Sequence, residues 1–343
     1  MWLQEYDVQV ARDRNEVAAF LHALGLGYDF DSDISVIIRR GNELVATGSL
    51  RGDVLQCIAV KQEHQGKGLS ARIVDWLVRT GFDRGLTKLF VFTGSDNTEV
   101  FRDLGFRQLV VTRLAAFLEL GTPTIDDYVK VLSTYAVNAC GPIGGIVMNS
   151  NPFTLGHRYL VERASQYSNH VFVLVVEEDR SAFPLSVRLE LVKRGIAHLN
   201  NVTVLPSGPY VVSLATFPSY FSAEETTHAL AGASIDATLY GKYIAKALGV
   251  TQRFVGTEPF SPVTAIYNST MDRIFAEYGL DLVEIPRLEV RGRAVSASLV
   301  REALRTDNYQ LMDMLVPEST REFLLSSEAT EIIAELKARS GRH

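Results

Sequence analysis

The chain has 343 residues, of which 47% are hydrophobic and 22% are charged, and this composition indicates a globular protein long enough for two domains. Its net charge of -6 comes without a basic tail or stripe, which argues against nucleic acid as a principal partner. The sequence shows neither a signal-peptide pattern nor an apolar stretch long enough to span a membrane, so we expect a cytoplasmic protein with no membrane partner.

Strand signals dominate the first part of the chain. Runs rich in β-branched and apolar residues, bounded by turn residues, predict three successive antiparallel strands and a further strand after them. These strands are expected at residues 34–38, 43–50, 54–60 and 88–93. A hairpin turn is expected at 39–42, and a short helix at 97–106 ends on Gly105 as its C-cap.

A glycine-rich loop separates the third strand from an amphipathic helix. The loop is Gln65-Gly66-Lys67-Gly68, and its glycines allow backbone N–H groups to crowd around a diphosphate. The order of elements and this loop resemble the GNAT acyltransferase fold, whose Q/R-x-x-G-x-G/A loop holds the pyrophosphate of coenzyme A. The resemblance implies that these four residues bind a coenzyme-A-like group.

Two features of this loop leave its function open. Ser70 stands where the GNAT pattern has Gly or Ala, so the loop is alternatively a plain helix N-terminus in a retained scaffold. No acid or base for acetyl transfer stands out, and we expect Glu63 and His64 to be solvated polar residues rather than catalysts.

Glycine and proline punctuate a connecting segment at residues 121–142, within which residues 125–137 are expected to be helical. We therefore predict a GNAT-like domain at 1–120, a linker at 121–142 and a second domain at 143–343. The two cysteines, Cys57 and Cys140, are far apart and lack metal-ligand spacing, so we expect ordinary thiols and no metal site built from protein ligands.

The most informative motif opens the second domain. An apolar strand at 146–148 leads through turn residues 149–152 into a helix that carries Thr154 and His157 in its first turn, and a strand at 171–176 follows. A helix N-terminus favours phosphate, and a hydroxyl and an imidazole can add hydrogen bonds to it. The alternative is that His157 is an ordinary helix-start residue.

Further strands alternate with helical segments, as a doubly wound, Rossmann-like parallel sheet requires. They are expected at residues 202–205, 237–240, 252–256 and 282–285. The tail from Tyr309 onward is expected to be helical.

A second phosphate motif precedes this tail. Ser296 is a suitable N-cap, Ser298 adds a hydroxyl to the first turn, and Arg301 lies beyond them on the same helix. The guanidinium can neutralise phosphate charge. The alternative is a capped surface helix with a solvated arginine.

The two motifs resemble the T-x-G-H and I-S-S-T-x-x-R signatures of the nucleotidyltransferase superfamily, whose members attack the α-phosphate of ATP. Four longer runs resemble the citrate lyase ligase family, at residues 146–160, 215–221, 253–260 and 295–301. This resemblance covers nearly the whole chain. It implies ATP and Mg²⁺ as cofactors, acetate as substrate, and as partner the acyl carrier (γ) subunit of citrate lyase with its phosphoribosyl-dephospho-coenzyme A group.

The resemblance also implies roles for individual residues. Thr154, His157 and Arg301 are expected to act on the triphosphate during catalysis. The expected ATP-binding residues are Asn151, Phe153, Gly156, Arg188, Gly256, Glu258, Ser296 and Ser298. For Arg188 a contact with the acetate carboxylate and an exposed position on a helix are alternatives, and Glu258 is alternatively a solvated loop carboxylate.

Three other functions stay open. The same ligase chemistry can serve a malonate decarboxylase carrier protein. The chain can also be an adenylyltransferase that makes a dinucleotide or dephospho-coenzyme A and carries a fused acetyltransferase domain. A non-enzymatic module that senses nucleotide or binds a carrier is the third.

Overall fold

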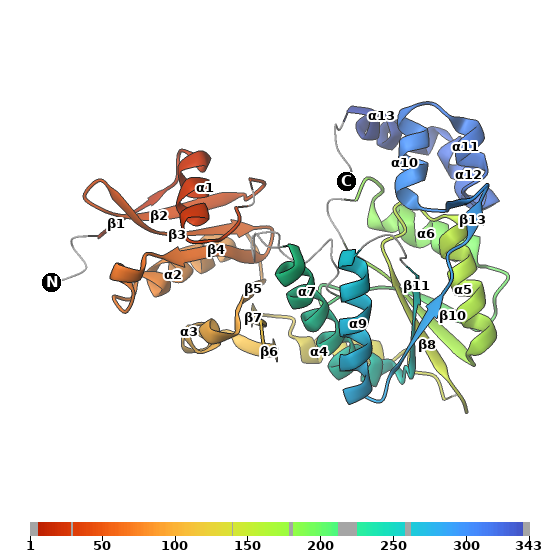
Figure 1. The fold of residues 1–343 in the computed structure, drawn as a ribbon, viewed down its shortest axis with the longest axis horizontal. Coiled ribbons are helices and arrows are strands. Elements are labelled where there is room, and N and C mark those ends of the chain that lie inside the picture. Colours follow the sequence, from red (N-terminus) through yellow and green to blue (C-terminus); the bar gives the residue numbers. More distant parts are fainter. Residues whose placement is uncertain are drawn as a thin grey trace. The chain divides into compact units, whose positions relative to one another are not determined.

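The computed structural model describes residues 6–28, 30–138, 140–177, 181–211, 225–257 and 262–338. The chain divides into two compact units (Figure 1). The first unit comprises Met1–Tyr128, Val212–Leu239 and Ile266–Thr270, and the second comprises Val129–Val211, Tyr240–Ala265 and Met271–His343. The expected domain limits at residues 120 and 143 stay a prediction.

Seven strands form the sheet of the first unit, in the order β1-β2-β3-β4-β5-β7-β6. They are β1 (Tyr6–Val10), β2 (Ile34–Arg40), β3 (Glu43–Arg51), β4 (Val54–Val60), β5 (Lys88–Gly94), β6 (Arg107–Val111) and β7 (Ala115–Gly121). Neighbours are antiparallel except β4 and β5, which run parallel and pair through Val54–Phe90 and Leu55–Val91. The four strands predicted in this region are confirmed as β2 to β5, whereas β1, β6 and β7 were not predicted.

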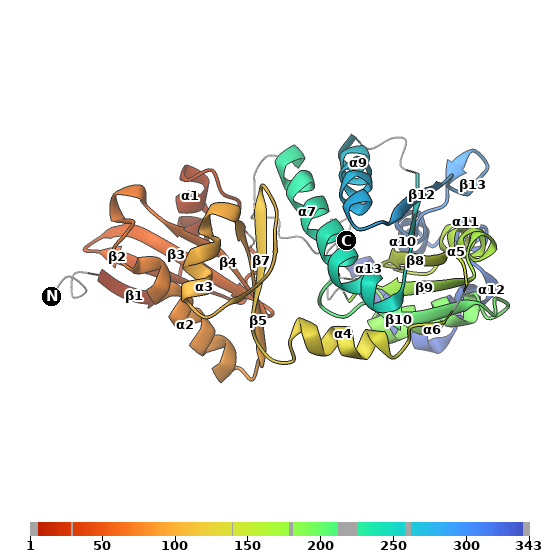
Figure 2. The same ribbon diagram turned by 90° about the horizontal axis from the view of Figure 1, so that it is seen from below.

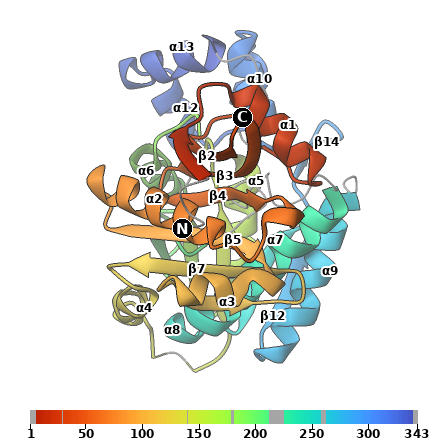
Figure 3. The ribbon, with the colours of Figure 1, turned by 90° about the vertical axis from the view of Figure 1, so that its left-hand side faces the viewer.

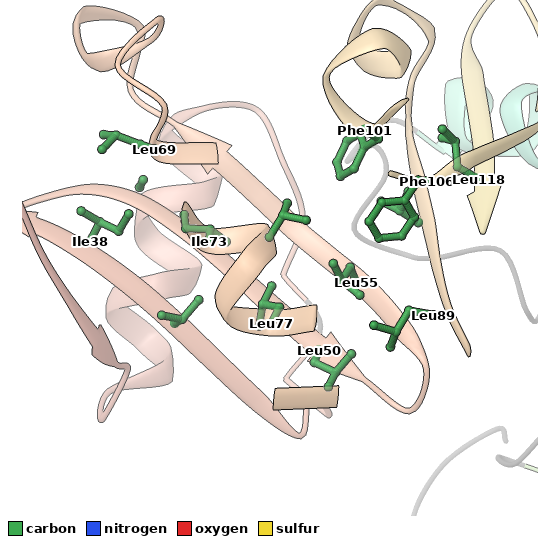
Figure 4. Close-up of a cluster of buried hydrophobic side chains, with 14 of the residues drawn as sticks. Ile38, Leu50, Leu55, Leu69, Ile73, Leu77, Leu89, Phe101, Phe106 and Leu118 are labelled. Carbon is green, nitrogen blue, oxygen red and sulfur yellow. The ribbon is translucent and has the colours of Figure 1, made fainter. Parts of the chain in front are cut away.

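Helices pack on both faces of this sheet (Figure 3). Helix α2 (Leu69–Asp83) packs Ile73 in a cluster with Ile38 of β2 (Figure 4), and α1 (Arg14–Ala23) packs on the opposite face with Ile37. Adjacent residues of a strand point to opposite faces, so one strand serves both helices. The short helices are η2 (Gln62–His64), η3 (Ser95–Asn97) and α3 (Thr98–Asp103). The predicted glycine at the end of α3 is confirmed, because Gly105, with φ +91°, directly follows the C-cap residue Leu104.

One predicted strand is wrong. Residues 237–240 lie in α7 (Glu225–Leu239) and in the π-helix η4 (Tyr240–Ala245) that continues it. A four-residue apolar run does not by itself distinguish a strand from a buried helix, and the residues before this run are rich in alanine, the strongest helix former. The helix expected in the connecting segment is confirmed as α4 (Ile125–Ser133), four residues shorter than predicted.

Five parallel strands form the sheet of the second unit, in the order β10-β9-β8-β11-β12 (Figure 2). They are β8 (Ile143–Met148), β9 (His170–Val175), β10 (Val202–Pro206), β11 (Gln252–Gly256) and β12 (Asp281–Ile285). This order, with β8 in the centre and later strands added on either side of it, is the doubly wound arrangement that the sequence predicted.

Helices cover the second sheet and extend beyond it. The helices are α5 (Leu155–Tyr167), α6 (Leu185–Gly195), α8 (Lys246–Leu248), α9 (Pro262–Glu277), α10 (Ala297–Arg305), α11 (Tyr309–Asp313), α12 (Glu318–Leu324), η5 (Ser327–Ala329) and α13 (Thr330–Ala338). A small hairpin of β13 (Glu289–Val290) and β14 (Arg293–Ala294) leads into α10. The predicted helical tail is confirmed. Among the described residues, no helix has the length and apolar character needed to cross a membrane.

Candidate active site

The strand order of the second sheet determines where its site lies. The chain leaves β8 towards β9 on one side, while β11 pairs with β8 on the other side. Ligands of open α/β sheets bind at the carboxyl ends of the strands where the order reverses in this way. Here that position is occupied by the loop after Met148 and by the end of β11 at Gly256.

The loop after β8 leads into α5 through a reciprocal capping box. Thr154 is the N-cap, and its Oγ1 accepts a hydrogen bond from the His157 N–H at 3.3 Å. In return, His157 Nδ1 accepts from the Thr154 N–H at 3.1 Å. Because Nδ1 is an acceptor, the neutral imidazole carries its proton on Nε2. The turn therefore presents a hydrogen-bond donor that has no net charge.

The surroundings of His157 keep it neutral. Burial, and to a smaller extent the positive charge of Arg287, lower the pKa of His157 from 6.5 to about 4. The imidazole lies nearly parallel to the ring of Phe153, with 5.8 Å between the ring centroids. Phe153 itself is fully buried and belongs to the core between α5, α6 and the sheet. The structure thus places this predicted ATP-binding residue beneath the histidine, where it supports the ring.

Gly156 brings the two predicted motifs into contact. A Cβ atom added at Gly156 would lie 3.0 Å from the Val295 carbonyl oxygen and 3.5 Å from Val295 Cβ. The backbone before α10 therefore passes directly over the first turn of α5. A side chain at position 156 would push these two segments apart.

The second motif has the predicted helix start. Ser296 is the N-cap of α10, and its Oγ accepts from the Leu299 N–H at 3.2 Å, which confirms the capping prediction. Arg301 is 8% exposed, so the alternative of a solvated surface arginine is wrong. Its guanidinium donates to the Asn151 carbonyl at 2.6 Å and to Ser298 Oγ at 3.2 Å.

Asn151 has two protein contacts that fix the loop. Its carbonyl oxygen accepts from Arg301, and its Oδ1 accepts from the Phe183 N–H at 3.0 Å. The side chain is 5% exposed. In this structure Asn151 therefore links the loop after β8 to α10 and to the segment before α6.

Three polar groups around this loop have no protein acceptor or donor among the described residues. They are the N–H of Gly156, the Oγ of Ser150 and the Nε of Arg301. The other amides of the first α5 turn are used, because Leu155 N–H donates to the Leu315 carbonyl and His157 N–H donates to Thr154. Together with the positive end of the α5 dipole, these groups form a site suited to an anion.

Arg188 is buried between the segments that follow β8 and β9. It is 1% exposed, which makes the alternative of an exposed helix arginine wrong. Its Nη1 donates to the carbonyl oxygens of Asn149 at 2.8 Å and Val176 at 2.7 Å and to Asn149 Oδ1 at 2.8 Å, while Nε donates to the Phe183 carbonyl. These contacts join the carboxyl ends of β8 and β9. Contact with phosphate or acetate stays a prediction for this residue.

The end of β11 brings in a residue that the sequence did not indicate. Gly256 is the last residue of β11, and a Cβ atom added there would contact Arg287 Cγ at 3.7 Å and Nε at 3.8 Å. Arg287 lies two residues after β12, so its position beyond the carboxyl end of a parallel strand was the signal available in the sequence. The predicted residue Glu258 lies outside the described residues.

The glycine-rich loop of the first unit leads directly into α2. Gly66 and Gly68 have φ +73° and +72°, a conformation that favours glycine, and Gly68 is the N-cap of α2. Gln65 Nε2 donates to the Val60 carbonyl and Lys67 Nζ donates to the Glu63 carbonyl. Within the described chain, no protein acceptor meets the first three amides of α2, at residues 69–71. These are the groups expected to face a diphosphate.

His64, beside this loop, is not the solvated residue that we expected. It is 4% exposed, and its Nδ1 lies 3.0 Å from the hydroxyl of Tyr6 on β1. The ring therefore ties the segment before the loop to the sheet. Glu63 is exposed, as predicted.

Comparison with known proteins identifies the family. Residues 143–324 match the citrate lyase ligase C-terminal domain, and residues 4–106 match the acetyltransferase (GNAT) family. The chain is 36% identical over 332 residues to the citrate (pro-3S)-lyase ligase of Klebsiella pneumoniae. The aligned residues make up 94% of this chain and 97% of the relative. The chain belongs to the citrate lyase ligase family. It is therefore an enzyme of the ligase class.

A second relative and a solved structure complete the comparison. The citrate (pro-3S)-lyase ligase of Escherichia coli K12 is 36% identical over 316 residues, or 90% of this chain and 89% of the relative. The crystal structure of Thermotoga maritima TmcAL bound with alpha-thio ATP is 15% identical, with a TM-score of 0.34, over 54% of this chain and 55% of that one. At that score the structural likeness carries no argument, and the family assignment rests on the sequence matches.

Proposed function

We propose that this chain is a citrate lyase ligase that uses ATP to activate acetate as acetyl-AMP. The acetyl group then passes to the thiol of the phosphoribosyl-dephospho-coenzyme A group on the acyl carrier (γ) subunit of citrate lyase, with release of AMP and diphosphate. Relatives of that name, similar along nearly the whole chain, support the proposal. The presence of a GNAT-related segment in the same chain also supports it, because the prosthetic group resembles coenzyme A.

The observation that carries the proposal is the set of unused polar groups between the two motifs. A buried polar group without a partner costs about 1–3 kcal/mol, so the Oγ of Ser150 and the Nε of Arg301, both buried and unpaired among the described residues, need an explanation. A triphosphate supplies it, because its oxygens accept from the Gly156 N–H, from Arg301 Nε and from the Ser150 hydroxyl.

The first step is an attack at phosphorus. An acetate oxygen forms a bond to the α-phosphorus, the bond to the bridging oxygen breaks, and diphosphate leaves. His157 Nε2–H and the Thr154 turn contact the triphosphate, while Arg301, with Ser296 and Ser298 beside it, neutralises charge on its outer phosphates. Mg²⁺ enters with ATP as a further source of positive charge, and we assign no protein ligand to it.

In the second step, the carrier thiolate attacks the carbonyl carbon of acetyl-AMP, the bond to the phosphate oxygen breaks and AMP leaves. The loop at Gln65 to Gly68 binds the diphosphate of the prosthetic arm through the amides of α2. Substituting both Gly66 and Gly68 by Ala places L side chains in the left-handed region, which costs about 1–2 kcal/mol for each residue. We expect the altered loop to raise the KM for the holo carrier at least about tenfold, since 1.4 kcal/mol is a factor of ten. The KM for ATP should be unchanged. An unchanged carrier KM would contradict this assignment.

Release of diphosphate tests the function as a whole. The enzyme is incubated with ATP, Mg²⁺ and a panel of short carboxylates, with the holo forms of the citrate lyase carrier and the malonate decarboxylase carrier and without either. Acetate-selective release that rises with the citrate lyase carrier supports the proposal, whereas preference for the other carrier would redirect it. Accumulation of an adenylated product in place of AMP would identify an adenylyltransferase. Substitution of His157 by Ala should lower acetate-dependent AMP formation, and an undiminished rate would remove this residue from the site.

A further inference from the structure

Arg287 lies at the same edge of the sheet as the T-x-G-H turn. Gly256 pairs with Ile285 of β12, and the Thr257 N–H donates to the Ile285 carbonyl, so the two strands stay paired to their ends. Two residues later, the side chain of Arg287 lies against Gly256. Its positive charge is also close enough to affect the imidazole of His157.

Three arginines surround this edge, and they differ in exposure. Arg188 and Arg301 are buried and donate to protein oxygens of the loop after β8. Arg287 is exposed. Because Arg287 is exposed, an incoming anion can reach its side chain from solvent.

The chemistry of carboxylate activation needs a positive charge at this position. The attacking carboxylate and the α-phosphate are both anionic, and charge on the non-bridging oxygens must be stabilised while both are bound. His157 Nδ1 accepts from the Thr154 N–H, which leaves an N–H donor at Nε2, but the imidazole is neutral. The side chain of Arg287 lies beside Gly256, within van der Waals distance of a Cβ atom added there.

We propose that Arg287 binds a non-bridging oxygen of the α-phosphate during adenylation, next to His157. This inference rests on the proposed function. The guanidinium offers paired N–H donors and a fixed charge, which suits a phosphate oxygen better than an ammonium does. Arg287 acts on the transition state more than on ATP binding, because the outer phosphates are held elsewhere.

Arg287→Gln is the informative variant, with Arg287→Lys to retain the charge and Arg293→Gln as the control. Arg293 is an exposed arginine of the adjacent hairpin that has no part in the site. Acetate-dependent diphosphate release by Arg287→Gln should fall in kcat by about 100- to 1,000-fold, the loss seen when one donor to a developing charge is removed. Affinity for a non-hydrolysable α,β-methylene ATP and the KM for acetate should each change less than about threefold, well under 1 kcal/mol. Arg287→Lys should be intermediate.

A second measurement separates direct contact from a structural role. In one diastereomer of alpha-thio ATP, sulfur replaces the non-bridging oxygen that Arg287 is proposed to bind. The ratio of the rate with ATP to the rate with this diastereomer should be smaller in Arg287→Gln than in the wild type, because the variant has lost the contact with that oxygen. A kcat within a factor of about three of the control, under 1 kcal/mol of barrier, would overturn the proposal. A rise in acetate KM with unchanged kcat would overturn it in favour of a carboxylate contact. A wild type that releases no diphosphate with any carboxylate would instead refute the proposed function itself.

Discussion

Substituting Gly156 by Ala tests the contact that joins the two motifs. The added Cβ would lie 3.0 Å from the Val295 carbonyl oxygen, so α5 and the segment before α10 must separate by a few tenths of an ångström. Overpacking of this kind destabilises by about 1–3 kcal/mol. Alanine recovers up to about 1 kcal/mol, because glycine is a poor helix former. The net change in the free energy of unfolding should therefore be small, at about 0–2 kcal/mol.

Activity should respond more strongly than stability. A displacement of about 1 Å in a positioned group costs about 100-fold in rate, so a few tenths of an ångström between the motifs should lower kcat/KM about tenfold. Urea unfolding gives the stability, and acetate-dependent diphosphate release gives the rate. The control is Gly94→Ala, where the new Cβ meets Asn97 Nδ2 at an ordinary 3.7 Å. A Gly156→Ala enzyme with wild-type kcat/KM would refute the reasoning, as would a loss of stability above 3 kcal/mol with full activity at low temperature.

Two further predictions concern buried charge and pH. Arg188→Met removes donors from three carbonyl oxygens and should lower the free energy of unfolding by about 3 kcal/mol or more, because each buried acceptor left without a donor costs about 1–3 kcal/mol. Arg194→Met, at an exposed ion pair with Glu322, should change it by less than about 1 kcal/mol, and equal urea midpoints for the two variants would contradict this. The pKa of His157 is lower in the folded chain than in the unfolded chain. As the pH falls, the unfolded chain therefore takes up a proton at His157 before the folded chain does. The contribution of this residue to stability is complete above pH 6.5 and is lost as the pH falls towards about 4. His157→Gln should therefore flatten urea-unfolding stability over that range, and parallel profiles for wild type and variant would show that the histidine titrates normally.

Periodicity and turn chemistry were sufficient to predict most of the fold. The five strands of the parallel sheet and four strands of the first sheet had clear apolar runs bounded by turns, and they are present as β8 to β12 and β2 to β5. The exception at residues 237–240 arose because the local composition of a buried helix and of a buried strand is the same over four residues. The strands β1, β6 and β7 were not predicted.

The site was predictable to the extent that its motifs are local. Thr154 and Ser296 cap their helices within three residues, so their roles follow from sequence spacing alone. The contact between Gly156 and Val295 and the position of Arg287 depend on which strands are neighbours, which local sequence does not contain. The burial of Arg188 could not be read from its neighbours either, because its acceptors come from three different segments.

Under the proposed function, the capping box has a consequence for the kind of nucleophile that can attack phosphorus at this site. The lone pair of His157 Nδ1 is occupied by the Thr154 amide, and Nε2 carries the proton, so this imidazole cannot take a proton from an incoming group. An alcohol or an ammonium group would need such a base before it could attack phosphorus. A carboxylic acid needs none, because it has already ionised at neutral pH. The turn thus favours nucleophiles that are already ionised at neutral pH, whatever the shape of the pocket that binds them.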